Sequence, residues 1–277
     1  MRSVLRPRSS TLAAFLVAAA AVAIPPAYCF STALLPSRSL RGSSVLHRRT
    51  PVAQKSRSVW GLTSTSMTGA QKITEATLGH YSQRAVQFYE GTKDHDVSQN
   101  RAALLRNLPT DRSLRLLDLG CGPGRDVQYF TGLGHEVTGL DGCKEFVDMC
   151  KKLSPTSSTL QQDLHALDLP RQHFDGIFCN AVLFHVKRSE LPRVLGELTS
   201  AVTPGGVIFV SNPRSMQDQD MENGGSQDDM RYGHYQTLES WRAVCERAGL
   251  EELEHYYRPP GRPLREQPWL ASVWRCP

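Results

Sequence analysis

A glycine-rich turn follows a short apolar run in the first half of the chain. Residues 116–124 read LLDLGCGPG, which spaces Gly120, Gly122 and Gly124 by two positions. Glycines at a strand-to-helix junction let the main chain approach a ligand closely and leave free amides for an anion. Asp118 stands two residues before the first glycine, where a carboxylate would repel a pyrophosphate but tolerate an ammonium or sulfonium group. The turn therefore favours a cationic cofactor over a dinucleotide, whose fingerprint places the third glycine one residue later.

A second acidic residue stands where the following strand should end. Asp141 comes directly after the run HEVTGL (135–140) and lies 23 residues beyond Asp118. An acid at the end of this strand can accept hydrogen bonds from both hydroxyls of a ribose. The spacing of the two acids and the glycines therefore indicates a cofactor that contains a ribose as well as a positive charge.

These and three further segments resemble the class I S-adenosylmethionine-dependent methyltransferases. The matching segments are LDLGCGPGRD (117–126), VTGLD (137–141), QQDL (161–164), FDGIFCNAVLFHV (174–186) and PGG (204–206). The resemblance implies S-adenosyl-L-methionine as the cofactor and an α/β fold, a Rossmann-like doubly wound sheet of seven strands with an antiparallel last strand. It places the methionine moiety at the glycines, the ribose at Asp141 and the adenine beside Asp163 and Leu164. The cofactor-binding residues expected in this way are Asp118, Gly120, Cys121, Gly122, Gly124, Asp141, Asp163, Leu164 and Asn180.

The segment after the fourth expected strand bears on the acceptor. Methyltransferases that act on DNA or on protein amides carry a polar residue, two prolines and an aromatic residue there, whereas this chain has NAVLFH (180–185). The segment resembles the small-molecule branch, which implies methyl transfer to a small-molecule acceptor with release of S-adenosylhomocysteine. Three alternatives stay open: a methyltransferase acting on protein or another macromolecule, a non-catalytic cofactor-binding module of the same fold, and a Rossmann-like domain using another nucleotide or none.

His185 is the candidate catalytic residue. It lies just past the fourth expected strand, at the edge of the sheet where ligands bind in open α/β folds. A general base is needed only if the acceptor must lose a proton, as an ammonium or a hydroxyl would, whereas a thiol or carboxylate, largely deprotonated already, needs none. A packing or positioning role for His185 therefore stays open. An arginine near the acceptor would suit a substrate carboxylate. The residues expected around the acceptor come from elements that flank the fold: Tyr81, Arg84, Phe88, Tyr89, His95, Tyr232, His234, Tyr235, Tyr257, Arg258, Pro259 and Pro260.

Apolar periodicity predicts an alternating α/β chain after residue 70. Helices are expected at 78–89, 98–108, 125 onward, 144–153, 189–202 and 238–248, and strands at 114–119, 135–140, 159–163, 173–179, 207–210, 251–257 and 269–275. Strands that alternate with helices form a mostly parallel sheet, whereas the last two strands follow one another and must pair antiparallel. Residues 217–230 are polar and contain glycine, which predicts a long loop, either a lid over the substrate or a disordered segment.

The start of the chain has the layout of a signal peptide. Three arginines within the first eight residues precede an apolar run of 14 residues at 11–24. The run is shorter than the roughly 20 residues needed to cross a bilayer. This layout predicts a signal peptide over 1–29, cleaved before Phe30, with an uncleaved anchor as the alternative. Cleavage leaves the mature chain without a stable membrane anchor.

Residues 30–68 are rich in Ser, Thr and Arg and contain no acidic residue. Transit peptides have this composition, and the two segments together resemble the bipartite presequences of algae whose plastids lie inside extra membranes. We therefore expect a plastid protein whose methyltransferase domain spans 70–277. The secretory pathway or another organelle is the alternative.

The charge and cysteine content of the chain argue against nucleic acid and metal ions as partners. Residues 1–74 contain ten basic and no acidic residues, whereas the remaining 203 residues contain 22 Lys and Arg against 27 Asp and Glu, a net charge of −5. Binding to a phosphate backbone needs a cationic face, so we expect no nucleic-acid partner. The seven cysteines show neither a CxxC pair nor metal-ligand spacing, and we expect reduced thiols and no metal site. The sequence leaves the oligomeric state open.

Overall fold

The computed structural model describes residues 69–225 and 230–277. The expected signal peptide (1–29) and transit-like segment (30–68) lie outside these residues. Within the described ranges, no helix is both long enough and apolar enough to cross a bilayer. The six cysteines of the same ranges are free.

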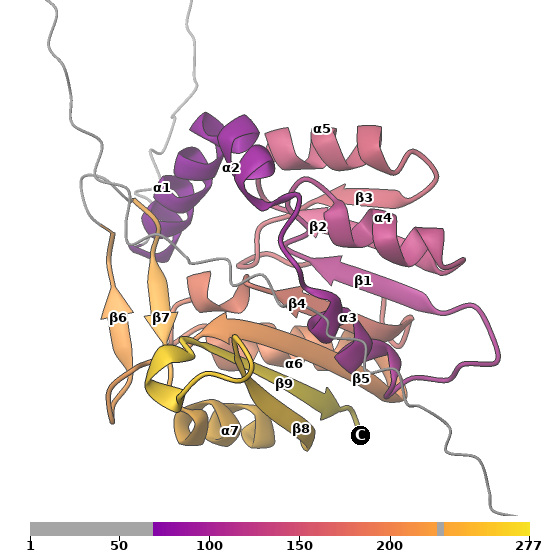
Figure 1. The fold of residues 1–277 in the computed structure, drawn as a ribbon. Helices are drawn as coiled ribbons and strands as arrows, with labels where there is room; N and C mark the ends of the chain where they lie inside the picture. The colour runs from indigo at the N-terminus through magenta and orange to yellow at the C-terminus, as the bar shows by residue number, and fades with distance from the viewer. Residues whose placement is uncertain (1–68, 226–229) are drawn as a thin grey trace, which may run out of the picture. The chain divides into compact units, whose positions relative to one another are not determined.

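A seven-stranded sheet forms the centre of the fold (Figure 1). Its strands are β1 (Arg115–Leu119), β2 (Glu136–Asp141), β3 (Ser158–Gln161), β4 (Phe174–Asn180), β5 (Val202–Pro213), β8 (Glu251–Arg258) and β9 (Trp269–Arg275). They lie in the order β3-β2-β1-β4-β5-β9-β8. Neighbours pair in parallel except at β9, which is antiparallel to both β5 and β8. This arrangement confirms the predicted doubly wound sheet with an antiparallel last strand.

Helices cover both faces of the sheet. They are α1 (Gly69–Gln83), α2 (Ala85–Thr92), α3 (Ser98–Leu105), α4 (Arg125–Gly132), α5 (Lys144–Leu153), α6 (Leu191–Ala201) and α7 (Leu238–Arg247), with short 3-10 helices η1 (Leu183–His185) and η2 (Leu264–Glu266). The bounds of α5 are the predicted ones. α4 begins at the predicted Arg125 because Gly124, with a φ of 97°, is in a left-handed conformation that an α-helix does not contain.

The two faces of the sheet have separate apolar cores. Leu117, Leu119 and Ile177 belong to the core under α6 and α7, whereas Leu116 and Phe178 belong to the core under α3, α4 and α5. Adjacent residues of a strand project to opposite faces, so a strand covered on both sides is buried and mostly apolar along its length. β4 is such a strand, since its first six residues are all buried. The two cores fix the carboxyl ends of β1 and β4, where the glycine turn and η1 follow.

The structure divides the helix predicted over 78–89. α1 and α2 meet at Arg84, which lies outside helical geometry (φ −119°, ψ 15°). Because the apolar spacing continues across the break, the pattern alone predicts one helix. The break allows Tyr81 of α1 and Phe88 of α2 to meet edge to face, with ring centroids 5.5 Å apart.

Part of the loop predicted over 217–230 is a strand. β6 (Met221–Asn223) pairs antiparallel with β7 (Gly233–Tyr235) in a separate two-stranded sheet (Figure 1). All three residues of β6 are exposed, so the segment has no apolar alternation from which a strand could be predicted. The pair is also joined by a hydrogen bond from Tyr232 Oη to Glu222 Oε1 (2.9 Å).

Candidate active site

The turn between β1 and α4 requires its glycines. Gly120, Gly122 and Gly124 have positive φ values of 68°, 53° and 97°, a conformation that residues with a Cβ atom rarely adopt. Space is restricted as well. A Cβ atom on Gly120 would lie 2.4 Å from the Val182 side chain, and one on Gly124 would lie 2.7 Å from Cys150 Sγ. The turn therefore has a fixed shape that a side chain at these positions would disturb.

This turn is joined to the end of β2. The Cys121 N–H donates to the Leu140 carbonyl (3.0 Å). Asp141 accepts through Oδ2 from the Gly122 N–H (2.9 Å) and through Oδ1 from the Cys143 N–H (2.8 Å). Burial raises the pKa of Asp141 to about 6, although these N–H groups act in the opposite direction. Both oxygens keep further acceptor capacity, so the carboxylate can receive the two hydroxyls of a ribose.

Asp118 is a buried acid at the base of the turn. Only 3% of the residue is exposed, and its Oδ2 has no hydrogen-bond partner in the described residues. Burial, followed by the nearby charge of Asp126, raises the pKa of Asp118 well above its ordinary value. A buried carboxyl oxygen without a partner is destabilising. A ligand with an ammonium group at the turn would supply the missing partner.

A cavity of about 530 Å³ lies between α1 and the turn that follows β2. Cys143, Asp163 and Thr74 are among its lining residues. Asp163 accepts from the His165 N–H (2.9 Å), and His165 Nδ1 lies 2.9 Å from Thr74 Oγ1. Leu164, expected beside the adenine, lies outside the lining and packs against the core under α6. The volume falls within the range of small-molecule sites.

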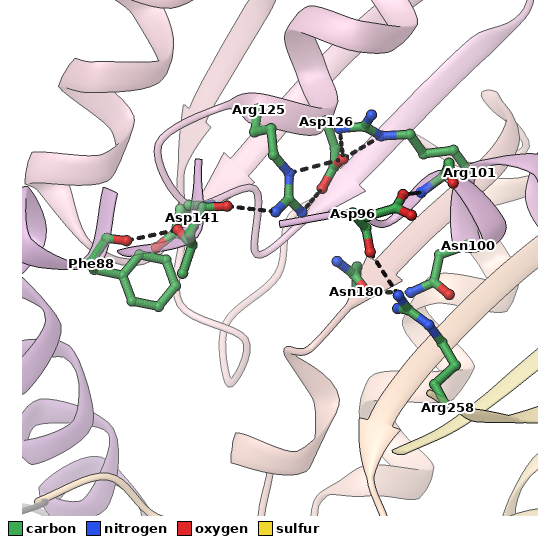
Figure 2. Close-up of polar contacts among 12 residues, drawn as sticks. Phe88, Asp96, Asn100, Arg101, Arg125, Asp126, Asp141, Asn180 and Arg258 are labelled. Carbon is green, nitrogen blue, oxygen red and sulfur yellow. Dashed lines mark hydrogen bonds and ion pairs between the residues drawn. The ribbon is translucent and has the colours of Figure 1, made fainter. Parts of the chain in front are cut away.

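Asn180 ends β4 and is held in place by α3. Its Oδ1 accepts from Asn100 Nδ2 (2.9 Å), as Figure 2 shows. Asn100 is fully buried, and its Oδ1 accepts from Tyr256 Oη (3.0 Å). Asn100 was not predicted from the sequence, because nothing local to α3 indicates a partner 80 residues away in the chain.

α2, α3 and α4 are linked beside the turn (Figure 2). Asp126 pairs with Arg125 Nη2 (2.7 Å) and with Arg101 Nη2 (2.6 Å). Arg125 Nη1 donates to the Thr92 carbonyl (3.0 Å), and Thr92 Oγ1 donates to the Phe88 carbonyl (2.7 Å). These contacts fasten the end of α2 to the start of α4. The sequence analysis assigned none of these roles.

Three aromatic rings gather over the glycine turn. Phe146 of α5 has its ring centroid 5.1 Å from that of Phe88 and 5.7 Å from that of Tyr81. Phe88 reaches the turn itself, since a Cβ atom on Gly122 would lie 3.8 Å from its Cε1. Tyr81 and Phe88 are two of the residues expected near the acceptor. Phe146 was missed, because an apolar residue on a helix face is equally typical of a core.

Both ring nitrogens of His185 have partners. Nδ1 lies 2.6 Å from the Tyr232 carbonyl oxygen, which can only accept, so Nδ1 carries a proton. In the neutral ring, Nε2 then accepts from the Tyr81 hydroxyl at 2.9 Å. Arg231 Nη1 donates to the same hydroxyl at 3.3 Å, and its guanidinium lies over the Tyr81 ring. His185 is therefore part of a chain of polar contacts that spans three separate segments. Arg84, also expected near the acceptor, is exposed.

The sequence was compared with models of known protein families. Residues 92–255 match the model of a methyltransferase domain family. The chain belongs to this family. The match spans the glycine turn, Asp141, Asn180 and His185, and it confirms the resemblance to class I S-adenosylmethionine-dependent methyltransferases.

Curated relatives match part of the chain. A malonyl-[acyl-carrier protein] O-methyltransferase from Enterobacter lignolyticus is 32% identical over 127 residues, which cover 45% of this chain and 49% of that protein. A trans-aconitate 2-methyltransferase from Azoarcus sp. is 32% identical over 124 residues, 43% of this chain and 48% of that protein. The chain thus spans about half the length of the curated relatives it matches.

A solved structure shows the same fold. The 1,6-didemethyltoxoflavin-N1-methyltransferase of Burkholderia thailandensis, with bound 1,6-didemethyltoxoflavin and S-adenosylhomocysteine, superposes with a TM-score of 0.63. The superposition covers 76% of this chain and 91% of that one, at 19% identity. Together with the family match, the bound S-adenosylhomocysteine supports S-adenosyl-L-methionine as the cofactor of this methyltransferase.

Proposed function

We propose that this methyltransferase transfers a methyl group from S-adenosyl-L-methionine to a carboxylate oxygen of a small-molecule acceptor. The observation that carries the proposal is the state of His185, whose two ring nitrogens are engaged by Tyr232 and Tyr81. Such a histidine suits an acceptor that has no proton to lose, and a carboxylate is already ionised at neutral pH. The Arg231 guanidinium beside Tyr81 adds a positive charge that favours an anionic acceptor.

The residues around the turn fit the cofactor. When bound, it supplies an electrophilic methyl group on a positively charged sulfur. We infer that the main chain of residues 120–124 and Asn180 hold the amino-acid end of the cofactor, with Asp118 as counter-charge. Asp141 would receive the ribose hydroxyls. Asp163 would lie beside the adenine. The unpartnered Asp118 Oδ2 and the cavity lined by Asp163 support this fit.

For a carboxylate acceptor, the protein's task is alignment. The rings of Tyr81, Phe88 and Phe146 form an apolar wall that keeps water from the reacting groups. The contacts of the Tyr81 hydroxyl with His185 and Arg231 fix the Tyr81 ring in that wall, and the positive charge of Arg231 attracts the acceptor's carboxylate. Holding the two reactants in a productive geometry supplies a large share of the rate of a bimolecular transfer.

The relatives support the same class of acceptor. Two of them are named for malonyl-[acyl-carrier protein] and trans-aconitate, and both of these acceptors carry carboxylate groups. The net charge of −5 over residues 75–277 supports a small molecule rather than nucleic acid as the acceptor.

The test uses the lability of methyl esters. The purified protein is incubated with S-adenosyl-L-methionine carrying a radioactive methyl group and a metabolite extract, and the products are treated with mild alkali. Methyl esters release volatile radioactive methanol, whereas methyl ethers, thioethers and N-methyl groups do not. We expect protein-dependent volatile label, and defined acids such as malonate and trans-aconitate are then tested singly. Protein-dependent label that is stable to alkali would contradict a carboxylate acceptor.

A hydroxyl acceptor is the second candidate, and the hydrogen bond from Tyr81 to His185 is the observation that favours it. With such an acceptor, the tyrosine and the histidine would form a relay for the released proton. His185→Gln should then lower turnover by about 10²-fold or more. A carboxylate acceptor instead predicts a loss of less than about tenfold, because no proton has to be removed.

We also propose that residues 1–68 direct the protein to a plastid. Their support is the basic start, the apolar run at 11–24 and the absence of acidic residues. Fused to a fluorescent reporter in an alga with a complex plastid, residues 1–68 should direct the reporter to that organelle. Deletion of 11–24 should leave it in the cytosol, because this run is the segment suited to the secretory machinery. Import that survives the deletion would contradict a bipartite presequence.

A further inference from the structure

Arg258 lies at the edge of the sheet where the site is built. It is the last residue of β8, and because β9 is antiparallel to both β5 and β8, the carboxyl ends of β8, β5 and β4 meet at one edge. Tyr256, two residues earlier, reaches Asn100 and through it Asn180. Alternate residues of a strand share a face, so Arg258 stands on the same face as Tyr256, one step nearer the ligand edge.

The guanidinium of Arg258 is partly satisfied. Nη2 donates to the main-chain carbonyl of Asp96 (2.7 Å), and Figure 2 shows the side chain turned toward that residue. The carboxylate of Asp96 is used elsewhere, since Oδ1 accepts from the Ser98 N–H at the start of α3 (2.9 Å). Nε of Arg258 is buried and has no hydrogen-bond partner among the described residues. Burial lowers the pKa of this side chain below its ordinary value.

Two neighbouring arginines differ from Arg258 in having a carboxylate as a direct partner. Arg125 and Arg101 both pair with the carboxylate of Asp126 at 2.7 and 2.6 Å, so each has a counter-charge. Among the described residues, Arg258 has a neutral carbonyl as its hydrogen-bond partner, and the charge of the Asp96 carboxylate acts on it without a direct hydrogen bond. A half-buried cation that lacks a directly paired carboxylate is costly, and an anionic ligand would offset the cost.

We propose that Arg258 binds a carboxylate of a ligand in the active site. Its unused Nε and a remaining N–H of the fork offer the paired donors that a carboxylate accepts. The inference rests on the proposed function, which supplies two sources of this group: the amino-acid end of the cofactor, near Asn180, and the acceptor. Nothing in the established family membership assigns Arg258 a role.

The first arm of the test measures binding of two adenosine compounds to the full chain by calorimetry. S-adenosylhomocysteine has the amino-acid carboxylate, and 5′-methylthioadenosine lacks it. If the cofactor is the source, Arg258→Met should weaken S-adenosylhomocysteine about tenfold or more, as expected for charge-assisted hydrogen bonds, and leave 5′-methylthioadenosine unchanged. Arg258→Lys should fall between, because it keeps the charge and loses the fork. Arg262→Met, at an exposed position in the next turn, is the matched control.

The second arm tests the acceptor as the source. The protein saturated with S-adenosylhomocysteine is heated with malonate or trans-aconitate as probes, and the rise in Tm is recorded. If the acceptor is the source, Arg258→Met should abolish the rise while binding of both adenosine compounds stays at the wild-type level. Either selective loss supports the proposal.

Other outcomes would overturn the proposal that Arg258 binds a ligand carboxylate. An equal loss of affinity for both adenosine compounds would mean that Arg258 only fastens the linker at Asp96. Wild-type behaviour of Arg258→Met in both arms would exclude a carboxylate partner. If Arg258→Met does not fold, the same comparisons with Arg258→Lys decide. A wild-type protein that does not bind S-adenosylhomocysteine would instead contradict the proposed function, which separates that failure from a failure of Arg258.

Discussion

The two ends of the proposed site, the cofactor end and the acceptor end, are built in different ways. At the cofactor end, Asp118, the glycine turn and Asp141 lie within one stretch of chain and are joined largely through main-chain groups. At the acceptor end, His185 bonds to Tyr81, 104 residues away, and to Tyr232, 47 residues away. The proposed acceptor end is therefore assembled by the fold from three segments.

This difference predicts different responses to mutation. Changes at the cofactor end strain a closely packed turn or remove a buried charge, so they should affect stability and cofactor affinity. Changes at the acceptor end remove single side-chain hydrogen bonds, which are worth less. They should affect acceptor binding and leave the cofactor affinity unchanged.

The largest effect is expected for Gly124→Ala. The residue has a φ of 97°, and the added Cβ would lie 2.7 Å from Cys150 Sγ and 2.9 Å from the Cys150 Cα. Left-handed strain and overpacking together should lower the free energy of unfolding by about 2–5 kcal/mol in a urea titration. Gly196→Ala is the control: Gly196 lies within α6 with open space around it. That variant should gain about 0.5–1 kcal/mol. Equal stabilities for the two variants would show that the turn tolerates a side chain.

Asp141→Asn should have the next largest effect, on cofactor affinity. The carboxylate accepts from Gly122 and Cys143 and, in the proposed site, from the ribose hydroxyls. Losing charge-assisted hydrogen bonds should weaken S-adenosylhomocysteine by about 1.5–3 kcal/mol, roughly 10- to 150-fold in Kd. Calorimetry provides the measurement, with Asp148→Asn as control, since Asp148 pairs with Lys144 and its side chain is 46% exposed. An unchanged Kd would remove Asp141 from the cofactor site.

The pKa of Asp141 makes the same region sensitive to pH. Its folded value of about 6 lies above its ordinary value of 3.8, so the folded protein binds this proton more tightly than the unfolded chain. The contribution to the stability of the ligand-free protein is therefore present at low pH and is lost as the pH rises to about 6. Ribose hydroxyls need the ionised form, so the affinity for S-adenosylhomocysteine should fall below about pH 6. Both trends should disappear in Asp141→Asn, and their persistence would assign them to another group.

The sequence predicts the cofactor end better than the acceptor end, for a physical reason. A glycine turn and the acid after the next strand are tied to one another through short loops, so their spacing in the chain reflects their spacing in the fold. The strands flanking them carry short apolar runs that are largely buried, which makes their bounds predictable within one or two residues. β1 (Arg115–Leu119), expected at 114–119, is an example.

Contacts between segments that are far apart in the chain leave no recognisable spacing or periodicity in the sequence. The bond between Asn100 and Asn180 joins a residue expected at the cofactor site, Asn180, to one that looks like an ordinary surface position in the sequence, Asn100. The break at Arg84 occurs inside continuous helical spacing, and β6 (Met221–Asn223) is exposed at each residue. In each case tertiary packing, rather than local periodicity, decides the structure.

The smallest effect is expected at His185. In the structure Nδ1 donates to the Tyr232 carbonyl, and Nε2 accepts from Tyr81. For a carboxylate acceptor, His185→Gln should lower kcat less than about tenfold, raise the acceptor's KM and leave the affinity for S-adenosylhomocysteine unchanged. Tyr81→Phe removes the other half of the same hydrogen bond and should give a similar KM.

The pH dependence of the His185 variant separates positioning from base catalysis. If His185 takes a proton from the acceptor, the substitution should lower kcat by about 10²-fold or more, because general bases commonly contribute that much. For an amine acceptor the loss should be relieved at higher pH, where the proton has already left to water. If His185 only holds Tyr81 in place, the kcat profile of the variant should run parallel to that of the wild type at every pH. We expect parallel profiles, because Nδ1 already donates to Tyr232 and Nε2 already accepts from Tyr81, so a proton of the acceptor could reach the imidazole only through the Tyr81 hydroxyl.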